Sequence, residues 1–133
     1  MNYLFFDSDI LIDAIRQVPL ALSALELAER QDTPAASVIV RMELVIGSSN
    51  KQSLMQTERL LAKLQLLTLT ASIADMADKL ITAFYLSHGL QIADALIAAT
   101  AIVHNAPLLS KNQRDFRFIP GLQLLPYPGI QTR

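Results

Sequence analysis

The sequence predicts an α/β fold, a three-layer α/β/α sandwich around a central parallel sheet of four to five strands. Short apolar runs that are stopped by polar residues alternate along the chain with segments whose apolar residues recur at helical spacing. Strands that alternate with helices form parallel sheets covered by helices on both faces. The chain has 133 residues, about the size of one domain, so residues 1–133 are expected to form a single domain.

The composition excludes several classes of protein. Twelve acidic and eleven basic residues give a net charge of −1, and 52% of the residues are apolar, which is typical of a compact protein and not of a disordered or polybasic one. With no cysteine and two histidines, the chain can build neither a disulfide scaffold nor a three-histidine zinc site. Its apolar runs are shorter than the roughly 20 residues of a membrane span, and its start lacks the basic region of a signal peptide. We therefore expect a cytoplasmic protein that does not enter the membrane.

The first part of the chain predicts a buried strand and two helices. Residues 3–6 are apolar and end abruptly at polar residues, the pattern of a strand that is buried on both faces. Residues 10–16 predict a short helix, and Pro19 suits the first turn of a second helix. Glu26 and Arg30 lie four residues apart and are expected to pair on the outer face of that second helix.

The middle of the chain predicts a second strand over residues 34–39 and a short helix over 41–46 that Gly47 ends. Asn50 can cap a longer helix after it. A third strand is expected over residues 66–70, where leucine and threonine alternate. The apolar stripe of the longer helix consists of Leu54, Thr57, Leu61 and Leu64.

In the last part, Ser72 and Asp75 have the spacing of a capping box for a helix that ends at Gly89. His88 lies at the end of that helix, where a cation complements the helix dipole. The apolar stripe of the helix consists of Ile73, Ala77, Leu80, Ile81 and Phe84. The remaining elements are an alanine-rich helix over 92–104, a strand over 107–109 and a fifth strand over 122–125.

Polar residues follow the predicted strands at the points where those strands end. Asp7 and Asp9 come directly after the first strand, and Glu43 lies one turn beyond the second. Ser110 and Asn112 follow the fourth strand. In open parallel sheets, ligands bind just outside the carboxyl ends of the strands, so these side chains are the first candidates for a functional site.

These acids also have structural explanations, which the sequence leaves open. Asp7 or Ser8 would serve as the cap of the next helix, and Asp94, in the first turn of the alanine-rich helix, complements the helix dipole. Glu43 is harder to explain in this way, because the cap position three residues before it would be Val40, whose side chain accepts no hydrogen bond.

Together, Asp7, Glu43 and Asp94 would place three carboxylates in one small cleft. At a separation of about 4 Å and an effective dielectric constant near 20, each like-charged pair costs roughly 4 kcal/mol, so the cluster needs a counter-charge. A set of oxygen ligands without cysteine favours Mg²⁺ or Mn²⁺ over zinc or copper. We therefore expect these three acids to bind a hard divalent cation.

Four segments in order carry a family resemblance. They are FDSDILID at residues 6–13, MELVIG at 42–47, IADALIAATA at 92–101, and LSKNQRDF at 109–116, which IPGL follows. With these segments the chain resembles the PIN-domain ribonucleases, in particular the VapC-like toxins of bacterial type II toxin–antitoxin pairs. The resemblance implies a metal-dependent endoribonuclease with a PIN-like α/β/α fold. It also implies a homodimer that a small antitoxin holds inactive by inserting into the active-site groove.

The resemblance also assigns roles to individual residues. It implies that Asp7, Glu43 and Asp94 are the catalytic, metal-binding carboxylates, with Ser8 and Ser110 as the hydroxyl residues that support them.

Two supporting positions depart from the family pattern. Asp9 stands where many members have asparagine, and Asn112 stands where many have a fourth acid. Asp115, one turn further on, would compensate for that missing acid. Asp9 adds a negative charge. Asn112 can still orient a water molecule or a ligand, so its departure predicts a weaker metal affinity and not an inactive protein.

Three bases lie beside the proposed site, namely Lys111, Arg114 and Arg117. Their spacing of three would put them on one helical face, where they would contact RNA phosphates; a solvated turn explains them equally well. Because the chain as a whole is not basic, we expect selectivity to come from the shape of a folded RNA such as a tRNA.

Two other functions remain as alternatives. An apolar strand followed by Asp7 and Asp9 also fits a haloacid-dehalogenase-like phosphatase, with Ser110 and Lys111 in its later roles, although Asp115 is the only acid after Asp94. The missing fourth acid also fits a non-catalytic, PIN-like interaction module.

Overall fold

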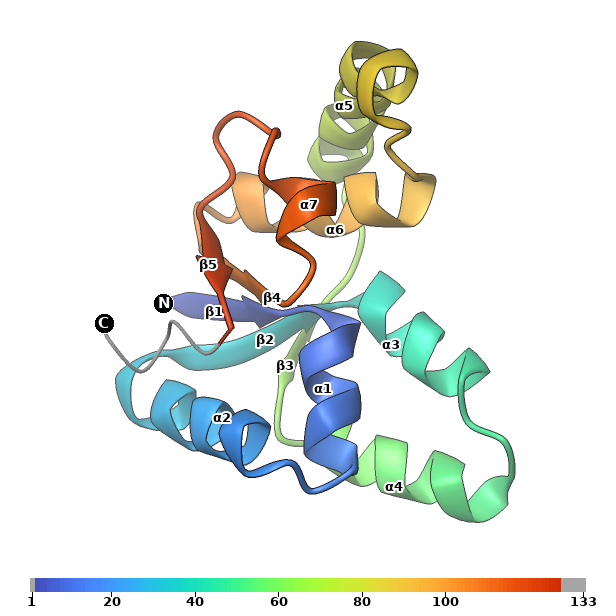
Figure 1. Ribbon diagram of the computed structural model, residues 1–133, viewed down its shortest axis with the longest axis vertical. Coiled ribbons are helices and arrows are strands. Elements are labelled where there is room, and N and C mark those ends of the chain that lie inside the picture. Colours follow the sequence, from blue (N-terminus) through green and yellow to red (C-terminus); the bar gives the residue numbers. More distant parts are fainter. Residues whose placement is uncertain (1, 128–133) are drawn as a thin grey trace.

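A five-stranded, all-parallel sheet forms the centre of the computed structural model, which describes residues 2–127 (Figure 1). The strands follow the order β3-β2-β1-β4-β5 across the sheet. Their bounds are β1 (Tyr3–Phe6), β2 (Thr33–Ser37), β3 (Gln65–Leu67), β4 (Leu108–Ser110) and β5 (Leu124–Pro126). Because the strands are parallel, their carboxyl ends all meet at one edge of the sheet.

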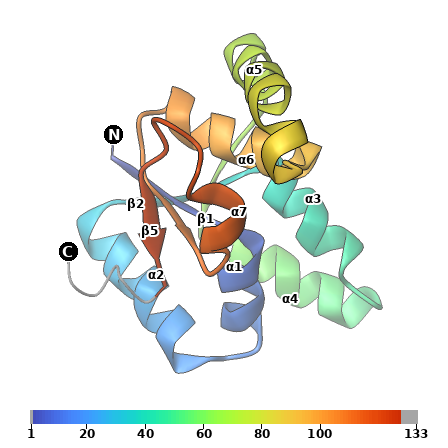
Figure 2. The ribbon, with the colours of Figure 1, turned by 45° about the horizontal axis from the view of Figure 1, so that its top comes forward.

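Helices cover both faces of this sheet. Figures 1 and 2 show α1, α2 and α4 on one side and α5 and α6 on the other, which confirms the predicted three-layer α/β/α sandwich. The bounds of the described helices are α1 (Ser8–Ile15), α2 (Pro19–Gln31), α3 (Val38–Ile46), α4 (Lys51–Leu61), α5 (Ala71–His88), α6 (Ile92–Val103) and α7 (Gln113–Phe116).

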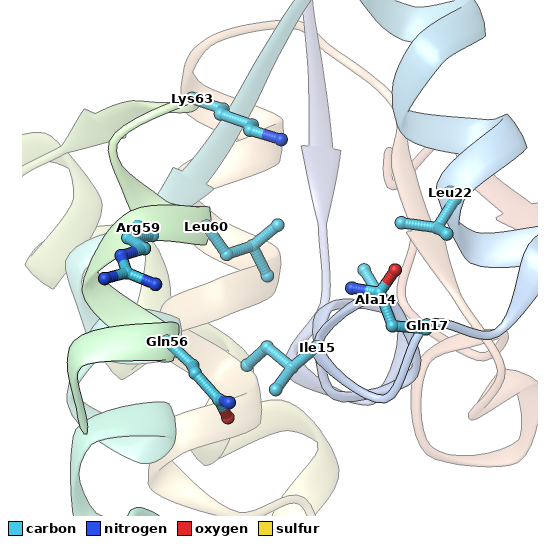
Figure 3. Close-up of a pocket in the computed structure, with 8 residues that line it drawn as sticks. All are labelled: Ala14, Ile15, Gln17, Leu22, Gln56, Arg59, Leu60 and Lys63. Atoms are coloured by element: carbon cyan, nitrogen blue, oxygen red, sulfur yellow. The ribbon is translucent and has the colours of Figure 1, made fainter. Parts of the chain in front are cut away.

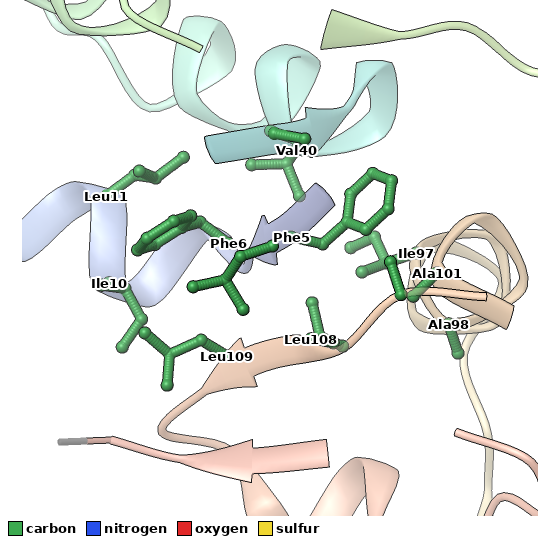
Figure 4. Packing of buried hydrophobic residues seen from close by; sticks show 14 of the residues in the cluster. Phe5, Phe6, Ile10, Leu11, Val40, Ile97, Ala98, Ala101, Leu108 and Leu109 are labelled. Carbon is green, nitrogen blue, oxygen red and sulfur yellow. The ribbon is translucent and has the colours of Figure 1, made fainter. Parts of the chain in front are cut away.

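The central strand β1 anchors the core. Phe5 and Phe6 are buried and point to opposite sides of the strand, Phe5 toward Ile97 of α6 and Phe6 toward Leu11 of α1 (Figure 4). Helix α6 packs on the sheet through fully buried alanines, which let its backbone approach closely. These alanines are Ala95, Ala98, Ala99 and Ala101. This packing fixes the ends of β1 and α6, where the candidate acids Asp7 and Asp94 lie.

The second strand and the helix after it depart from their predicted bounds. The strand predicted over 34–39 ends at Ser37, and the helix predicted over 41–46 begins earlier, at Val38. The Ser37 hydroxyl accepts a hydrogen bond of 3.1 Å from the backbone N–H two residues on and so caps α3. The β-branched residues after this cap favour a strand by propensity, but the cap starts a helix there. The prediction that Val40 occupies the cap position was therefore wrong.

The start of α5 also differs from the prediction. Thr70 caps this helix, because its hydroxyl accepts a hydrogen bond of 3.2 Å from the backbone N–H three residues on. The capping box predicted for Ser72 and Asp75 is therefore wrong, and both residues lie inside the helix. The third strand, predicted over 66–70, is limited to β3, because its last predicted residue is the helix cap.

Several local predictions are confirmed. Asn50 and Ser53 form a reciprocal capping box at the start of α4, and Gly89 ends α5 in the left-handed conformation at φ +65°. Glu26 and Arg30 form an ion pair of 2.7 Å on α2. The last two strands lie one to two residues further along the chain than predicted. None of the helices within residues 2–127 is both long and apolar enough to cross a membrane.

Candidate functional site

Asp7 lies at the carboxyl end of β1 and is buried. Its backbone N–H donates to the Leu109 carbonyl at 3.0 Å, which holds the ends of β1 and β4 together. Its Oδ1 accepts a hydrogen bond from the backbone N–H of Ser8 at 2.8 Å, and its Oδ2 accepts one from the Ser110 hydroxyl at 2.7 Å. Burial raises the pKa of Asp7, although both hydrogen bonds lower it. Asp7 is thus the N-cap of α1 and also the most constrained acid at this edge of the sheet.

Asp9 lies beside Asp7 in the first turn of α1. Its Oδ2 accepts a hydrogen bond from the backbone N–H of Lys111 at 3.1 Å, and the Ser110 hydroxyl lies 3.4 Å away. Its Oδ1 is buried and has no hydrogen-bond partner. Burial, followed by the charge of Asp7, raises the pKa of Asp9 to about 6.

Glu43 extends toward the same acids from α3. Because Ser37 caps this helix, Glu43 lies in its second turn, where no capping role explains a glutamate. Burial and then the charge of Asp7 raise the pKa of Glu43, and the Ser8 hydroxyl lowers it through a hydrogen bond. The Oε1 atom of Glu43 is buried without a hydrogen-bond partner. The expectation of an unusual glutamate holds, although the cap assumed in its support was wrong.

Asp94 lies in the first turn of α6, as expected, and is half-buried. Burial raises its pKa to about 6, and the charges of Asp7, Asp115 and Glu43 contribute further, in that order. Asp94 therefore interacts electrostatically with acids from three other parts of the chain. The structure brings all three predicted metal-binding acids within range of one another's charge.

Asn112 and Asp115 lie on the outer side of this group. The Asn112 side-chain amide donates to Asp115 Oδ2 at 2.6 Å, and its backbone N–H donates to the Ser110 hydroxyl at 2.9 Å. The charge of Asp115 raises the pKa of both Asp7 and Asp94. Asp115 thus contributes a negative charge next to the position where the fourth acid is missing.

The residues fit a hard cation in their chemistry. All candidate donors are oxygens, and two of them, Asp9 Oδ1 and Glu43 Oε1, are buried without a partner. The carboxylate ion pairs found within residues 2–127 involve Glu26, Glu58 and Asp13, and none of them includes Asp7, Glu43 or Asp94. The charge of Lys111 only partly offsets the burial and the charge of Asp7 that raise the pKa of Asp9.

The candidate acids do not lie as close together as the ligands of a bound metal ion. In the described part of the chain, no three His, Cys, Asp or Glu side chains are gathered closely enough to hold a metal ion. Asp7, Glu43 and Asp94 nevertheless influence one another's charge, and their binding of a metal ion stays a prediction.

The three predicted RNA-binding bases separate into two groups. The Lys111 ammonium forms an ion pair of 2.5 Å with Asp13 and lies 5.7 Å from the centre of the Tyr127 ring. Arg114 and Arg117 instead line a hollow of about 310 Å³ beside α7. The prediction of one shared helical face is wrong for Lys111, because α7 begins only at Gln113.

Sequence reasoning missed two residues at this edge, His88 and Phe118. They line a hollow of about 220 Å³ together with Asp94 and Asp115. The sequence places them 30 positions apart, one at a helix end and the other among apparent core phenylalanines. No local pattern in the sequence indicates that their rings meet.

A different hollow of about 330 Å³ lies between α1, α2 and α4 (Figure 3). Its lining includes Arg59 and Lys63 but no carboxylate. It adjoins the carboxyl-terminal end of α1, whereas the candidate acids lie at the other end of that helix. This hollow therefore does not belong to the candidate site.

Comparisons with known proteins agree with the motifs and the fold. Residues 4–122 match the PIN domain. Ribonuclease VapC19 of Mycobacterium tuberculosis is 37% identical over 119 residues, which cover 88% of this chain and 94% of that protein. Ribonuclease VapC2 of Rickettsia felis is 33% identical over 129 residues, with coverage of 89% and 92%.

Solved structures show the same relationship. VapBC2 from Rickettsia felis, crystallised with a DNA fragment from its promoter, has a TM-score of 0.83 at 30% identity, covering 93% of this chain and 98% of that chain. A toxin–antitoxin complex from Klebsiella pneumoniae has a TM-score of 0.72 at 30% identity, covering 90% and 94%. The chain belongs to the PIN-domain family, among the relatives of the VapC ribonucleases.

Proposed function

We propose that this protein is a metal-dependent endoribonuclease that hydrolyses RNA phosphodiester bonds, the toxin of a toxin–antitoxin pair. Its curated relatives are named Ribonuclease VapC, and the resemblance of its sequence segments to that family implies that Asp7, Glu43 and Asp94 are the metal-binding acids. In this proposal Asp7, Glu43 and Asp94 bind Mg²⁺ or Mn²⁺. When bound, such an ion activates a water molecule and stabilises the charge that develops on the phosphoryl group.

One observation carries this proposal: at the edge of the sheet where Asp9 Oδ1 and Glu43 Oε1 are buried without a hydrogen-bond partner, burial and then the charges of Asp7, Asp115 and Glu43 raise the pKa of Asp94 to about 6. Four acids from separate segments are thus held in mutual repulsion, and no base among the described residues neutralises them. A fold gains no stability from such an arrangement, whereas a cation-dependent enzyme needs it.

The supporting residues orient the acids. Ser110 donates its hydroxyl hydrogen to Asp7 and also receives the backbone N–H of Asn112, so it links the first acid to the segment after β4. The hydroxyl of Ser8 lowers the pKa of Glu43, against the larger effects of burial and of the charge of Asp7, and so favours its ionised form. Asp9 adds a further carboxylate oxygen beside Asp7. These contacts restrict the rotation of the acids and reduce the cost of arranging them around an ion.

Contact with RNA is assigned to the bases beside the site. Arg114 and Arg117 form no ion pair with any described residue, so both are available for phosphates. Lys111 contributes less, because Asp13 already pairs with it. With a net charge of −1, the protein gains little from general attraction to RNA, so it selects the shape of a folded RNA, for which a tRNA is one candidate.

Two protein partners complete the proposal. The structural neighbours include VapBC toxin–antitoxin complexes, which supports a small antitoxin as a partner here. The homodimer is what the family resemblance implies. Exposed apolar side chains that are available for such an interface include Leu86, which is 95% exposed, Ile46, which is 83% exposed, and Ile92, which is 71% exposed.

Of the two alternatives, the haloacid-dehalogenase-like phosphatase loses its support, because the chain belongs to the PIN-domain family. The non-catalytic interaction module is the remaining competitor, and it is motivated by Asn112. A module that has lost catalysis does not need acids that repel one another, and this argues for the enzyme.

The test is RNA cleavage by the wild-type protein after chelation and after Mn²⁺ is restored. We expect chelated protein to be inactive and Mn²⁺ to restore cleavage. Asp94→Asn should remain inactive with Mn²⁺, whereas Asp78→Asn, on the exposed face of α5, should cleave like wild type. Equal cleavage by Asp94→Asn and Asp78→Asn would contradict the proposal.

A further inference from the structure

Two adjoining hollows extend outward from the candidate acids. The inner one is lined by Asp94, Asp115, His88 and Phe118, and the outer one is lined by Arg114 and Arg117 together with the same His88, Asp115 and Phe118. Since three lining residues are shared, the two hollows form one path that starts at an acid of the candidate site. We call this path the ring-lined groove.

Its wall is a cluster of three aromatic rings. The His88 and Phe118 rings are stacked, with centroids 4.0 Å apart and planes inclined by 14°. Phe84 packs behind them at 5.2 Å from Phe118 and 5.9 Å from His88. Phe84 and Phe118 pack on the hydrophobic core, while His88 is exposed. The cluster is thus a rigid platform with an imidazole as its outermost ring.

Hydrogen bonding also fixes the orientation of that imidazole. The Ser87 hydroxyl lies 2.7 Å from His88 Nδ1. Phe118 covers one face of the ring, so the second face is the one that a flat partner can approach. If His88 served only as a positive charge that complements the helix dipole at the end of α5, it would need neither its stacking on Phe118 nor this fixed orientation.

The charges on the groove change sign along its length. Asp94 lines only the inner hollow and Asp115 lines both, whereas Arg114 and Arg117 line only the outer hollow and form no ion pair with any residue in the range 2–127. A ligand that fits this pattern has a flat ring and a neighbouring phosphate. A nucleotide of an RNA chain has both.

We propose that the ring-lined groove binds one unpaired nucleotide of the RNA, next to the phosphate that is cleaved. Its base stacks on the open face of His88, and its phosphate lies between Arg114 and Arg117. A base inside a duplex is already stacked and paired, so this site accepts only a single-stranded segment or a loop. The inference rests on the proposed ribonuclease function and adds the residues of this chain that hold the nucleotide, namely His88, Arg114 and Arg117.

The experiment measures binding and cleavage of a short labelled RNA, once unpaired and once annealed to its complement. Binding is followed by fluorescence anisotropy in EDTA, and cleavage is followed as KM and kcat in Mn²⁺. The variants are His88→Ala, His88→Phe and Arg117→Ala. The matched control is Lys79→Ala, which removes an exposed base from the same helix two turns earlier.

We expect wild type to bind and cut the unpaired RNA and not the duplex. His88→Ala should weaken binding and raise KM by roughly tenfold with kcat little changed, and His88→Phe should restore both, because stacking tolerates either ring. Arg117→Ala should weaken binding in low salt, and Lys79→Ala should behave as wild type. Unchanged binding in His88→Ala, failure of His88→Phe to restore it, or equal cleavage of the duplex would overturn the inference.

The two proposals fail in different ways. A wild-type protein that binds unpaired RNA through His88 but does not cut it in Mn²⁺ contradicts the ribonuclease function and leaves the nucleotide site standing. A protein that cuts RNA equally well with and without the His88 ring contradicts the nucleotide site alone. If His88→Ala weakens binding only to a co-expressed protein partner and not to RNA, the groove is a protein interface and the inference is wrong.

Discussion

The two ends of α1 have opposite character. At its amino-terminal end, Asp7 and Asp9 are partly or fully buried, repel each other and have raised pKa values. At its carboxyl-terminal end lies the hollow of Figure 3, of about 330 Å³ against about 220 Å³ for the hollow beside Asp94, with Arg59 and Lys63 in its lining and no carboxylate. The contrast teaches that the size of a hollow does not locate the chemistry. Acids that the fold holds together against their repulsion are the better guide.

The same contrast concerns stability. The hollow at the carboxyl-terminal end of α1 has its charged side chains, Arg59 and Lys63, at the surface, where they change the free energy of unfolding little. The acidic end holds anions that burial and neighbouring charges destabilise, so it lowers the free energy of unfolding at neutral pH.

The largest effect is expected from Asp7→Asn, which keeps the shape and removes the charge. RNA cleavage should fall by roughly 10³-fold, because the acid most firmly held by hydrogen bonds is lost. Lys63→Ala, in the hollow at the other end of α1, should cleave like wild type. Circular dichroism checks that both variants are folded, and a comparable loss in Lys63→Ala would remove the distinction between the two ends.

Asn112→Asp restores the acid that many family members have at this position and should change both the metal affinity and the stability of the protein. We expect Mn²⁺ to bind roughly tenfold more tightly, since the acidic group gains a ligand or an ordering partner. The metal-free protein should be less stable, because the amide that now donates to Asp115 becomes a like charge. Calorimetric titration and chemical unfolding measure the two quantities, and unchanged Mn²⁺ affinity would show that position 112 lies outside the metal site.

The pH dependence of stability follows from Asp9 and Asp94. Both have a pKa of about 6 in the folded protein, above the value of 3.8 in the unfolded chain, so the folded state binds more protons between these values. The free energy of unfolding should therefore fall as the pH rises from about 4 to 6, by about 1 kcal/mol after allowance for solvent screening.

Urea unfolding at pH 4.5 and pH 7 measures this change. Asp94→Asn should reduce the pH dependence, and Asp78→Asn, whose carboxylate is exposed on α5, should not. Stability that rises over this interval would contradict the electrostatic description of the site.

The smallest effect is expected from Asp13→Asn, in the middle of α1. It releases Lys111 from its ion pair, so RNA binding should tighten modestly, with a salt dependence steeper by about one phosphate contact. Binding measured at two salt concentrations checks this. An unchanged salt dependence would mean that Lys111 does not reach the RNA.

Local signals made much of this fold predictable. The apolar strand that stops at Asp7, the cap at Asn50 and the left-handed Gly89 each depend on neighbouring residues only, and the structure has all three. The bounds failed where two local preferences compete. After Ser37, β-branched residues favour a strand but the serine hydroxyl starts a helix.

The candidate site was predictable in part. The rule that ligands bind at the carboxyl ends of parallel strands brought Asp7 and Ser110 together, and the structure joins them by a hydrogen bond. The stacking of His88 on Phe118 depends on how α5 and the segment after α7 pack, which no local pattern contains. The metal-binding roles and the single-domain organisation remain predictions.

The most direct test of the proposed metal site is equilibrium binding of Mn²⁺ at pH 7. We expect the wild-type protein to bind the ion and to become more resistant to thermal unfolding. Asp94→Asn should lose both effects, whereas Asp78→Asn should keep them. A wild-type protein that Mn²⁺ neither binds nor stabilises, or an Asp94→Asn variant that responds as wild type does, would contradict the proposed metal site.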